Sequence, residues 1–372
     1  MKAWPVVAIV SVQLFLCSAH WFLYFTWTHF WWPLSPTAAS ALGVVLTVLS
    51  LSFMGAALLG YRFFNWLVRA VYLIACIWLG LLNFLFFGAW LAWLVDIALR
   101  LFTAGATHST ARPYIAGGIL AAAVAATVYG ILNARHIRQQ RVTVKLPNLP
   151  PSWRGRTALV VSDIHLGNIN RMRFARRIAA MARKLDPAII FIAGDLFDGT
   201  RADPNQLAAP LFELTPPLGV FFIGGNHEEF GGSNHYEDAL RRAGMRVLDN
   251  ERVDVDGLQI IGVPYRSTYP LQLRAYLESL HLVGGAASIL LNHVPNRLPI
   301  AEHAGVSLQI SGHTHGGQVF PFSLITKRAF GKFSYGLQRF GDMQVLTSSG
   351  AGTWGPPMRV GTHPEIVLLT FE

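Results

Sequence analysis

The sequence carries little charge and almost no cysteine. Of its 372 residues 13% are charged and 52% are hydrophobic, whereas soluble domains carry about 25% charged residues. So apolar a composition excludes an intrinsically disordered chain and argues against a purely soluble enzyme. Cys17 and Cys76 are the two cysteines, and both lie in apolar runs. A disulfide framework is therefore excluded for the rest of the chain.

The shortage of charge is confined to the first third. Residues 1–133 contain five Lys or Arg and a single acid, Asp96, for a net charge of +4. Residues 134–372 contain the other 25 basic and 19 acidic residues, for a net charge of +6. The chain therefore divides into a nearly uncharged part and a mildly basic part with an ordinary globular composition.

Four apolar stretches in the first third are each long enough to cross a bilayer, which needs about 20 residues. They run over residues 6–27, 37–60, 70–95 and 114–132. A cleaved signal peptide is the alternative for the first stretch, and buried core helices are the alternative for the others. Because three nearly uncharged stretches follow the first, we predict a transmembrane bundle of four helices.

Basic residues flank these spans unequally. If all four stretches cross, one side holds only Arg100 and Arg112 near the span ends. The other side holds Lys2, Arg62, Arg69, Arg135, Arg138, Arg141 and Lys145. The positive-inside rule then places the N-terminus and the domain after the fourth span in the cytoplasm. This side depends on residues 70–95 forming one span.

We expect three segments: a transmembrane anchor of four helices over residues 1–134, a linker over residues 135–156 and a catalytic domain over residues 157–372. The linker is basic, and Pro147, Pro150 and Pro151 disfavour a helix there. It can lie on anionic headgroups or be a solvated connection, and the sequence supports both equally.

Beyond residue 156, short apolar runs alternate with amphipathic stretches. Strands are predicted over residues 157–161, 188–193 and 220–223, with helices over 171–184 and 205–214 between them. Further strands are predicted over residues 259–263, 288–291, 307–310, 344–347 and 366–371. Alternation of this kind is typical of an α/β domain whose sheet strands are covered by helices.

Polar clusters follow five of these strands. In chain order they are Asp163-Ile164-His165, Gly194-Asp195-Leu196-Phe197-Asp198, Gly225-Asn226-His227-Glu228, Asn292-His293 and Gly312-His313-Thr314-His315. Ligands of α/β sheets bind outside the carboxyl ends of the strands. Each cluster alone has an ordinary explanation as a turn or a surface pair, but five in succession indicate one shared site.

The side chains in these clusters are typical of a metal centre. Two aspartates, one asparagine and four histidines supply oxygen and nitrogen ligands without a thiolate, which suits Mn, Fe or Zn. Seven ligands are too many for one catalytic ion that keeps an open position. They fit two divalent metal ions that share a carboxylate, as two-metal hydrolysis of phosphate esters requires.

Together the motifs resemble the calcineurin-like metallophosphoesterase superfamily. Gly-His-Thr-His-Gly-Gly-Gln at residues 312–318 and Ser-Ser-Gly-Ala-Gly-Thr at residues 348–353 resemble its bacterial membrane-attached branch. The resemblance covers about residues 140–372. It implies a four-layer α/β/β/α sandwich and, with the spans, a multi-pass protein of the bacterial cytoplasmic membrane whose catalytic domain is cytoplasmic.

The resemblance also implies a role for each site residue. One metal ion would be held by Asp163, His165 and His315, and the other by Asn226, His293 and His313. Asp195 would bridge the two ions. His227 would stabilise the phosphoryl oxygens or protonate the leaving group. Asp198 and Glu228 would orient ligands by hydrogen bonds, with turn capping as the alternative.

These features predict a membrane-anchored phosphoesterase that hydrolyses phosphate monoesters, diesters or pyrophosphates. Residues 319–337 are aromatic and basic, as expected of a surface against lipid headgroups, so we expect a lipid-linked substrate. The alternatives for this segment are a surface that binds a polyanionic substrate and a hairpin packed on the domain. Some relatives in the branch resemble hydrolases of UDP-2,3-diacylglucosamine. The alternatives are a membrane sensor or scaffold that only binds phosphate compounds and a nucleic-acid or nucleotide phosphodiesterase. A net charge of +6 without a base-stacking motif argues against nucleic acid as a partner.

Overall fold

The computed structural model describes residues 3–31, 33–103, 107–200, 202–282 and 286–372. They form two compact units. The first comprises residues up to 131 together with 355–358, and the second comprises residues 132–354 and 359–372.

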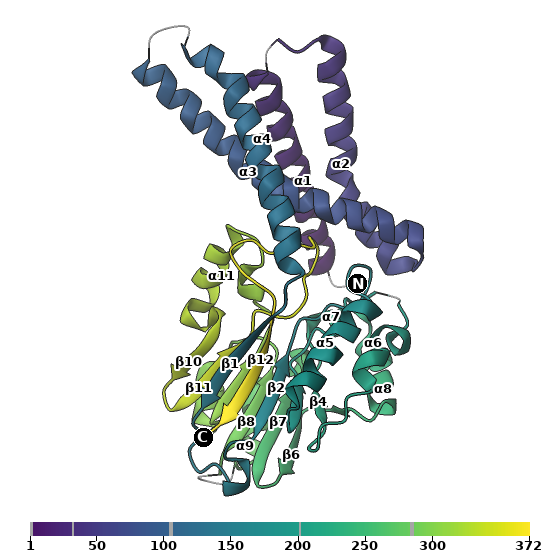
Figure 1. Ribbon diagram of the computed structural model, residues 1–372, viewed down its shortest axis with the longest axis vertical. Helices are drawn as coiled ribbons and strands as arrows, with labels where there is room; N and C mark the ends of the chain where they lie inside the picture. The colour runs from purple at the N-terminus through teal and green to yellow at the C-terminus, as the bar shows by residue number, and fades with distance from the viewer. Residues whose placement is uncertain (1–2, 32, 104–106, 201, 283–285) are drawn as a thin grey trace. The chain divides into compact units, whose positions relative to one another are not determined.

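The first unit consists of long apolar helices (Figure 1). They are α1 Ala3–Phe30, α2 Pro36–Arg62, α3 Trp66–Phe102 and α4 Thr107–Ala134. Among the described residues, four helices are long and apolar enough to span a membrane, as the sequence predicts. Helix α3 is one unbroken helix of 37 residues, about 55 Å long at 1.5 Å per residue. The stretch 70–95 therefore belongs to a single span.

Side-chain caps start two of these helices. Ser35 accepts a hydrogen bond from the backbone N–H of Ala38 at the start of α2, and Asn65 accepts one from Val68 at the start of α3. Helix α4 starts at Thr107, earlier than the predicted stretch 114–132, so Pro113 lies inside the helix rather than before it. Pro113 is the seventh residue of α4, beyond the first turn, so the helix continues past a residue that cannot donate a backbone hydrogen bond.

Buried polar groups inside the bundle have partners. The Trp78 indole N–H donates to His20 Nε2 at 2.8 Å. Asp96 is fully buried, and its carboxylate pairs with Arg100 at 2.7 Å and with Arg112 at 2.9 Å. The two arginines at this end of the bundle are thus partly neutralised, and α3 is tied to α4 by an ion pair.

The second unit contains two six-stranded mixed sheets. The strand order is β1-β12-β2-β3-β4-β5 in one sheet and β10-β11-β9-β8-β7-β6 in the other. Strands β2, β3 and β4 are parallel, and so are β7, β8 and β9. The strands are β1 Arg138–Val144, β2 Thr157–Val161, β3 Ile189–Ile192, β4 Val220–Phe222, β5 Arg246–Val247, β6 Glu251–Val255, β7 Leu258–Val263, β8 Ser288–Asn292, β9 Leu308–Ser311, β10 Gly336–Phe340, β11 Met343–Thr347 and β12 Glu365–Phe371.

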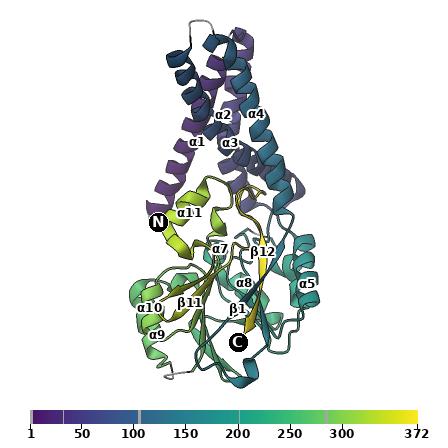
Figure 2. The ribbon, with the colours of Figure 1, turned by 60° about the vertical axis from the view of Figure 1, so that its left-hand side comes forward.

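Helices cover the outer face of each sheet. The helices of this unit are α5 Met172–Leu185, α6 Pro204–Phe212, α7 Asn226–Gly231, α8 Ser233–Arg242, α9 Pro270–Ser279, α10 Leu298–His303 and α11 Phe322–Phe330, with short 3-10 turns η1 Pro151–Trp153, η2 Tyr265–Ser267, η3 His315–Gly317 and η4 Gly331–Ser334. In Figure 2, α9 and α10 flank one side of this unit and α5 flanks the other.

Alternation along the strands builds this layering. In β7, Ile260 faces the core between the sheets, whereas Ile261 packs with Leu273 of α9 and Ala301 of α10. Successive side chains of a strand point to opposite faces, so strands that are apolar throughout require cover on both sides. The result is the α/β/β/α sandwich that the resemblance implies.

One strand lies where the sequence suggests only a linker. Strand β1 pairs in parallel with β12 along its whole length, from Arg138 opposite Glu365 to Val144 opposite Phe371. It was missed because it is an edge strand with the sequence Arg-Gln-Gln-Arg-Val-Thr-Val and an exposed outer face, which lacks an apolar run. Trp153, farther along the same segment, is fully buried. The exact domain boundaries stay a prediction.

Candidate metal centre

The site lies at the carboxyl ends of five strands from both sheets. Asp163 and His165 follow β2, Asp195 follows β3, and Asn226 begins α7 after β4. From the other sheet, His293 follows β8, and His313 and His315 follow β9. The structure brings all seven predicted ligands together, along with His227, Asp198 and Glu228, through the contacts described below.

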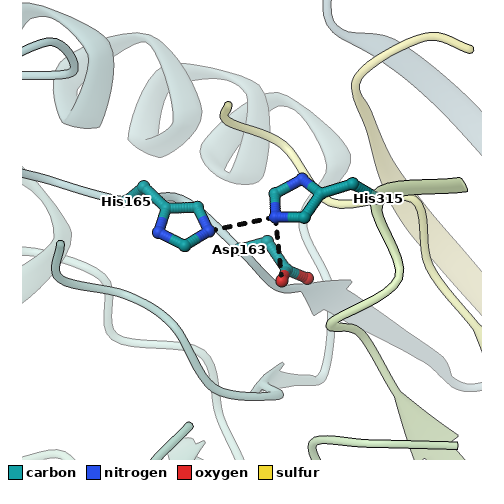
Figure 3. A group of neighbouring side chains, drawn as sticks. All are labelled: Asp163, His165 and His315. Atoms are coloured by element: carbon teal, nitrogen blue, oxygen red, sulfur yellow. Dashed lines mark hydrogen bonds and ion pairs between the residues drawn. The ribbon is translucent and has the colours of Figure 1, made fainter. Parts of the chain in front are cut away.

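Asp163, His165 and His315 form the first cluster (Figure 3). His165 Nε2 and His315 Nε2 lie 3.1 Å apart, and His315 Nε2 lies 3.5 Å from Asp163 Oδ1. Two imidazole nitrogens that face each other cannot both carry a hydrogen in this gap. At least one lone pair therefore points into the cluster, as metal coordination requires.

The second cluster contains His293, His313 and Asn226. His293 Nε2 lies 3.1 Å from Asp195 Oδ2, and His313 Nδ1 lies 2.9 Å from Asn226 Oδ1. His293 Nδ1 bonds the carbonyl of Ala193 at 2.8 Å. That bond requires a hydrogen on Nδ1, so Nε2 is the ring nitrogen left to face the cluster and available to a metal ion once its proton is displaced.

Asp195 connects the two clusters. Its Oδ2 lies 3.1 Å from His293 Nε2 and 3.9 Å from His165 Nε2. Its Oδ1 accepts the backbone N–H of His227 at 2.9 Å. Asp195 is 2% exposed, and its carboxylate lies close to a histidine of each cluster.

The backbone at the site is held in unusual conformations. Five of the predicted ligands adopt positive φ angles: Asp163 (51°), His165 (51°), Asp195 (53°), His313 (68°) and His315 (49°). Non-glycine residues rarely adopt this left-handed region, and such strain persists only where the surroundings enforce it. Its concentration at one site indicates that the direction of these side chains is under functional demand.

Two glycines permit the close approach of the ligands. A Cβ at Gly225 would lie 2.2 Å from Asp195 Oδ1, and a Cβ at Gly312 would lie 2.3 Å from Asp163 Oδ2. Any side chain there would displace a carboxylate of the site. The glycine that precedes Asn226 and the glycine that precedes His313 are therefore steric requirements.

Glu228 organises two of the loops. Its fully buried carboxylate accepts backbone N–H groups from Asp195 at 3.0 Å, Phe197 at 2.8 Å and Gly225 at 2.8 Å. Burial, and then the nearby charge of Asp195, raises the pKa of Glu228 to about 7. Glu228 therefore caps backbone N–H groups, the alternative considered for it above. This cap also holds the loop that carries Asp195.

His227 lies at the opening of the site. Its ring packs edge-on against His165 with centroids 4.7 Å apart, and its side chain is 12% exposed. Asp198 Oδ1 lies 3.8 Å from His227 Nδ1 and 3.6 Å from His165 Nδ1. Burial, and then the proximity of His165, lowers the pKa of His227. The Asp198 carboxylate thus lies close to both His165, a candidate metal ligand, and His227, the candidate acid.

Charges within the site oppose one another. Burial raises the pKa of Asp163. Burial alone would also raise the pKa of Asp195, but the charge and hydrogen bond of His293 outweigh it and hold this pKa well below its usual range. Burial, and then His293, lowers the pKa of His313 to about 4. Burial alone would lower the pKa of His293, but the charge of Asp195 outweighs it and raises this pKa to about 10. His293 is thus the charged partner of Asp195, and a cation bound there would replace the proton on its Nε2.

Arg359 is a site residue that sequence analysis missed. Its side chain is fully buried, and it donates to the carbonyls of His315, Ser349, Gly350 and Gly352 at 2.6–3.2 Å. It therefore fastens the turn that carries His315 to the loop after β11. An isolated arginine in a turn gives no signal in the sequence, because its partners are carbonyl groups that are remote along the chain.

The donor set fits two divalent metal ions. The described residues contain three groups of His and carboxylate ligand atoms within 4.8 Å of one another, and these groups overlap at His165 and Asp195. Among the described residues, His165 Nδ1 and Asp198 Oδ1 are buried without a hydrogen-bond partner, since the 3.6 Å between them is too long for a hydrogen bond. Buried polar atoms in proteins are almost always satisfied, so these atoms favour bound cations and their water.

Known proteins share this arrangement of motifs. Residues 156–317 match the family model described as calcineurin-like phosphoesterase. The chain is 32% identical over 256 residues to an uncharacterized metallophosphoesterase of Aquifex aeolicus, across 67% of this chain and 97% of that protein. It therefore belongs to the calcineurin-like phosphoesterase family. It is a metal-dependent phosphoesterase of a family that uses two metal ions.

Two further relatives are longer than the matched region. An uncharacterized metallophosphoesterase of Campylobacter jejuni is 34% identical over 238 residues, 62% of each chain. A Danio rerio protein described as a transmembrane protein with metallophosphoesterase domain is 29% identical over 263 residues, 66% of this chain and 60% of that protein. This chain spans about three fifths of both relatives. With its own four long apolar helices, it is a membrane protein.

Proposed function

We propose that this phosphoesterase hydrolyses a phosphate or pyrophosphate ester carried on a lipid, at the surface of the bacterial cytoplasmic membrane. The observation that carries the proposal is the surface of α11, which is apolar, basic and attached to the metal centre. The four long apolar helices would anchor the chain in a bilayer, and the surface of α11 suits contact with lipid headgroups.

Helix α11 exposes three large apolar side chains close together in sequence. Phe322, Leu324 and Ile325 are 48%, 57% and 61% exposed. Lys327 and Arg328 lie in its last turn, and Lys332 follows it. Apolar side chains beside cations are typical of helices that lie in the interface of an anionic bilayer. The charge complementarity favours lipid headgroups as the occupant of this surface.

The α11 segment is joined to the metal centre. Phe330, its last residue, packs edge-on against His313 with centroids 6.3 Å apart. Thr314, between the two histidines of the Gly-His-Thr-His motif, donates its hydroxyl to the Ser334 carbonyl at 2.8 Å. A lipid headgroup at α11 would therefore lie within reach of the ligands that follow β9.

The proposed ligand roles follow the two clusters. Asp163, His165 and His315 would hold one ion, Asn226, His293 and His313 would hold the other, and Asp195 lies close to both sets. Ions of Mn, Fe or Zn bound there would supply positive charge for the phosphoryl oxygens and lower the pKa of water. His227 faces the substrate side and would bind a phosphoryl oxygen or protonate the departing alcohol. Asp198 orients His227 and His165.

The cytoplasmic side is proposed from the charge of the flanks. Arg100 and Arg112, the two basic residues on the poorer side, are both paired with Asp96. The opposite flanks carry the larger basic excess, so the positive-inside rule points to a cytoplasmic catalytic domain. A reporter fused to the C-terminus tests this side.

The proposed lipid substrate is tested by comparing embedded and soluble esters. The full chain in vesicles of anionic phospholipid is given UDP-2,3-diacylglucosamine or phosphatidic acid, and a water-soluble diester serves as the reference. A Leu or Ile side chain contributes about 1.5–3 kcal/mol when fully buried, and contact with a bilayer would bury only part of each. Leu324→Ser/Ile325→Ser should therefore lower the ratio of lipid to soluble turnover by at least about tenfold, which corresponds to about 1.4 kcal/mol.

The matched control is Leu271→Ser on α9, which is 83% exposed. It should leave the ratio unchanged. An unchanged ratio in the α11 variant, or turnover of soluble esters alone by the wild type, contradicts the lipid proposal. Binding of phosphate compounds without turnover of any ester would support a sensor instead.

A further inference from the structure

A pair of exposed aromatic side chains flanks the candidate acid His227. Phe230 lies three residues after His227 on α7, so both side chains share one face of the helix. The ring centroids of His227 and Phe230 are 5.8 Å apart, and those of His227 and Trp354 are 5.5 Å apart. Phe230 is 65% exposed and Trp354 is 46% exposed. Hereafter Phe230 and Trp354 are called the aromatic pair.

Trp354 is held in place by a side-chain amide. Gln318 Nε2 donates to the Trp354 carbonyl at 2.9 Å, and the Trp354 N–H donates to Gln318 Oε1 at 3.0 Å. Both polar atoms of the Gln318 side chain thus hydrogen-bond to the backbone of Trp354. Gln318 itself is fixed, because its carbonyl accepts the Thr362 hydroxyl at 2.9 Å. The glutamine therefore ties Trp354 to the turn that carries His315.

This arrangement is costly unless it has a ligand. Large aromatic side chains are stabilised by burial, yet Phe230 and Trp354 stay 65% and 46% exposed beside a histidine that is nearly buried. Two hydrogen bonds fix the Trp354 backbone, so its side chain is held in this position. A preorganised apolar surface beside a reactive group is typical of a binding site.

We infer that the aromatic pair is the binding surface for the alcohol that leaves phosphorus, and that this alcohol carries an alkyl or acyl chain. Hydrolysis breaks the bond between phosphorus and the alcohol oxygen, water oxygen bonds to phosphorus, and a proton goes to the departing alkoxide. A group that departs beside His227 would lie close to the rings of Phe230 and Trp354, each of which is within 6 Å of the His227 ring. The inference rests on the proposed function and specifies which part of the substrate meets the protein there.

An alkyl chain fits this surface better than a nucleobase does. The aromatic pair offers two ring faces and a single polar group, the Trp354 indole N–H, whereas recognition of a base depends on several hydrogen bonds to its edge. Chain packing needs only apolar area. The pair therefore selects by apolar length, with Trp354 as a specificity-determining residue and Gln318 as the residue that positions it.

The test is a series of linear alkyl phosphates from ethyl to octyl, assayed below their aggregation limits as monoesters and as their methyl diesters. These alcohols are similarly acidic, so differences in turnover report on binding of the chain. Because a methylene in a hydrophobic pocket changes kcat/KM by about tenfold or more, this open surface should favour octyl over ethyl by about tenfold. Trp354→Ala should reduce the ratio to about one.

Two variants complete the test. Gln318→Ala should lower the octyl-to-ethyl ratio partway with metal content retained, because the indole stays but loses its anchor. Tyr269→Ala removes a tyrosine that is 68% exposed on the same unit and should leave the ratio unchanged. An unchanged ratio in Trp354→Ala overturns the inference, even if overall activity falls. So does a wild type that shows no length preference, prefers nucleoside phosphates or hydrolyses no alkyl ester.

The outcomes separate this inference from the proposed function. A wild type that acts on bilayer lipids, with a length preference that survives Trp354→Ala, keeps the function and removes the role of Trp354. A wild type that acts on free alkyl phosphates alone, with a preference that Trp354→Ala abolishes, keeps the aromatic pair and removes the bilayer substrate.

Discussion

Replacing Arg359 by methionine tests the buried clamp beside His315. The change keeps the length and apolar bulk of the side chain but removes donors from the carbonyls of His315, Ser349, Gly350 and Gly352. A buried acceptor left without its hydrogen bond costs about 1–3 kcal/mol. Removing the buried guanidinium offsets part of this loss of stability, because burying its charge is itself unfavourable. The same burial lowers the pKa of Arg359 to about 10.

The net loss should be about 3–5 kcal/mol. For a domain of this size, 1 kcal/mol shifts Tm by about 2–4 °C, so Arg359→Met should lower Tm by about 6–20 °C. Arg359→Lys keeps the charge and a donor and should recover part of the loss. Both are measured by thermal unfolding of the full chain in detergent at fixed metal concentration.

Arg183→Met is the control. Arg183 pairs with Glu213 at 3.6 Å on the surface, with side chains 49% and 71% exposed, and such pairs contribute about 0–1 kcal/mol. Its Tm should stay within about 4 °C of the wild type. A Tm for Arg359→Met that is equally close to the wild type would refute the clamp.

Three further changes test the site and its frame. Gly312→Ala should lower metal occupancy, measured by elemental analysis, because the new Cβ would lie 2.3 Å from Asp163 Oδ2; full occupancy would contradict the steric argument. Burial raises the pKa of Glu365, so its contribution to stability is full below the ordinary carboxyl pKa and is lost as pH rises through the folded pKa. Glu365→Gln should therefore gain Tm relative to the wild type between pH 4.5 and 7, and a difference independent of pH would count against this. Chelation should destabilise the wild type by about 3 kcal/mol if metal is present at 100 times its Kd, and an unchanged Tm would show that no structural energy resides in the ions.

The fold class and the site could be predicted because they depend on local patterns. Apolar strands followed directly by Asp, Asn or His leave a strong signature, since the chemistry must lie where parallel strands end. The same logic explains the predicted spans, whose length is set by the bilayer. What made each ligand recognisable was its neighbour, such as Gly225 before Asn226 and Gly312 before His313.

What sequence analysis missed depends on contacts between remote segments. Strand β1 gains its partner β12 from the far end of the chain, and its own sequence is polar because it lies at an edge. Arg359 bonds carbonyls, which every residue has, so no residue type marks its partners. The specific roles of Glu228 and Gln318 also lie in backbone N–H and carbonyl groups, which periodicity does not reveal.

The most direct test of the two-metal centre is the metal content of the full chain and of Asp195→Asn, measured together with turnover of a phosphate ester. Asp238→Asn, at a carboxylate whose side chain is 58% exposed, serves as the control. The wild type and the control should bind two divalent ions per chain. Asp195→Asn should lose at least one ion and reduce turnover by more than about 100-fold, the scale of losing a preorganised charge at a reaction centre. Two ions retained with full turnover in Asp195→Asn would contradict the account.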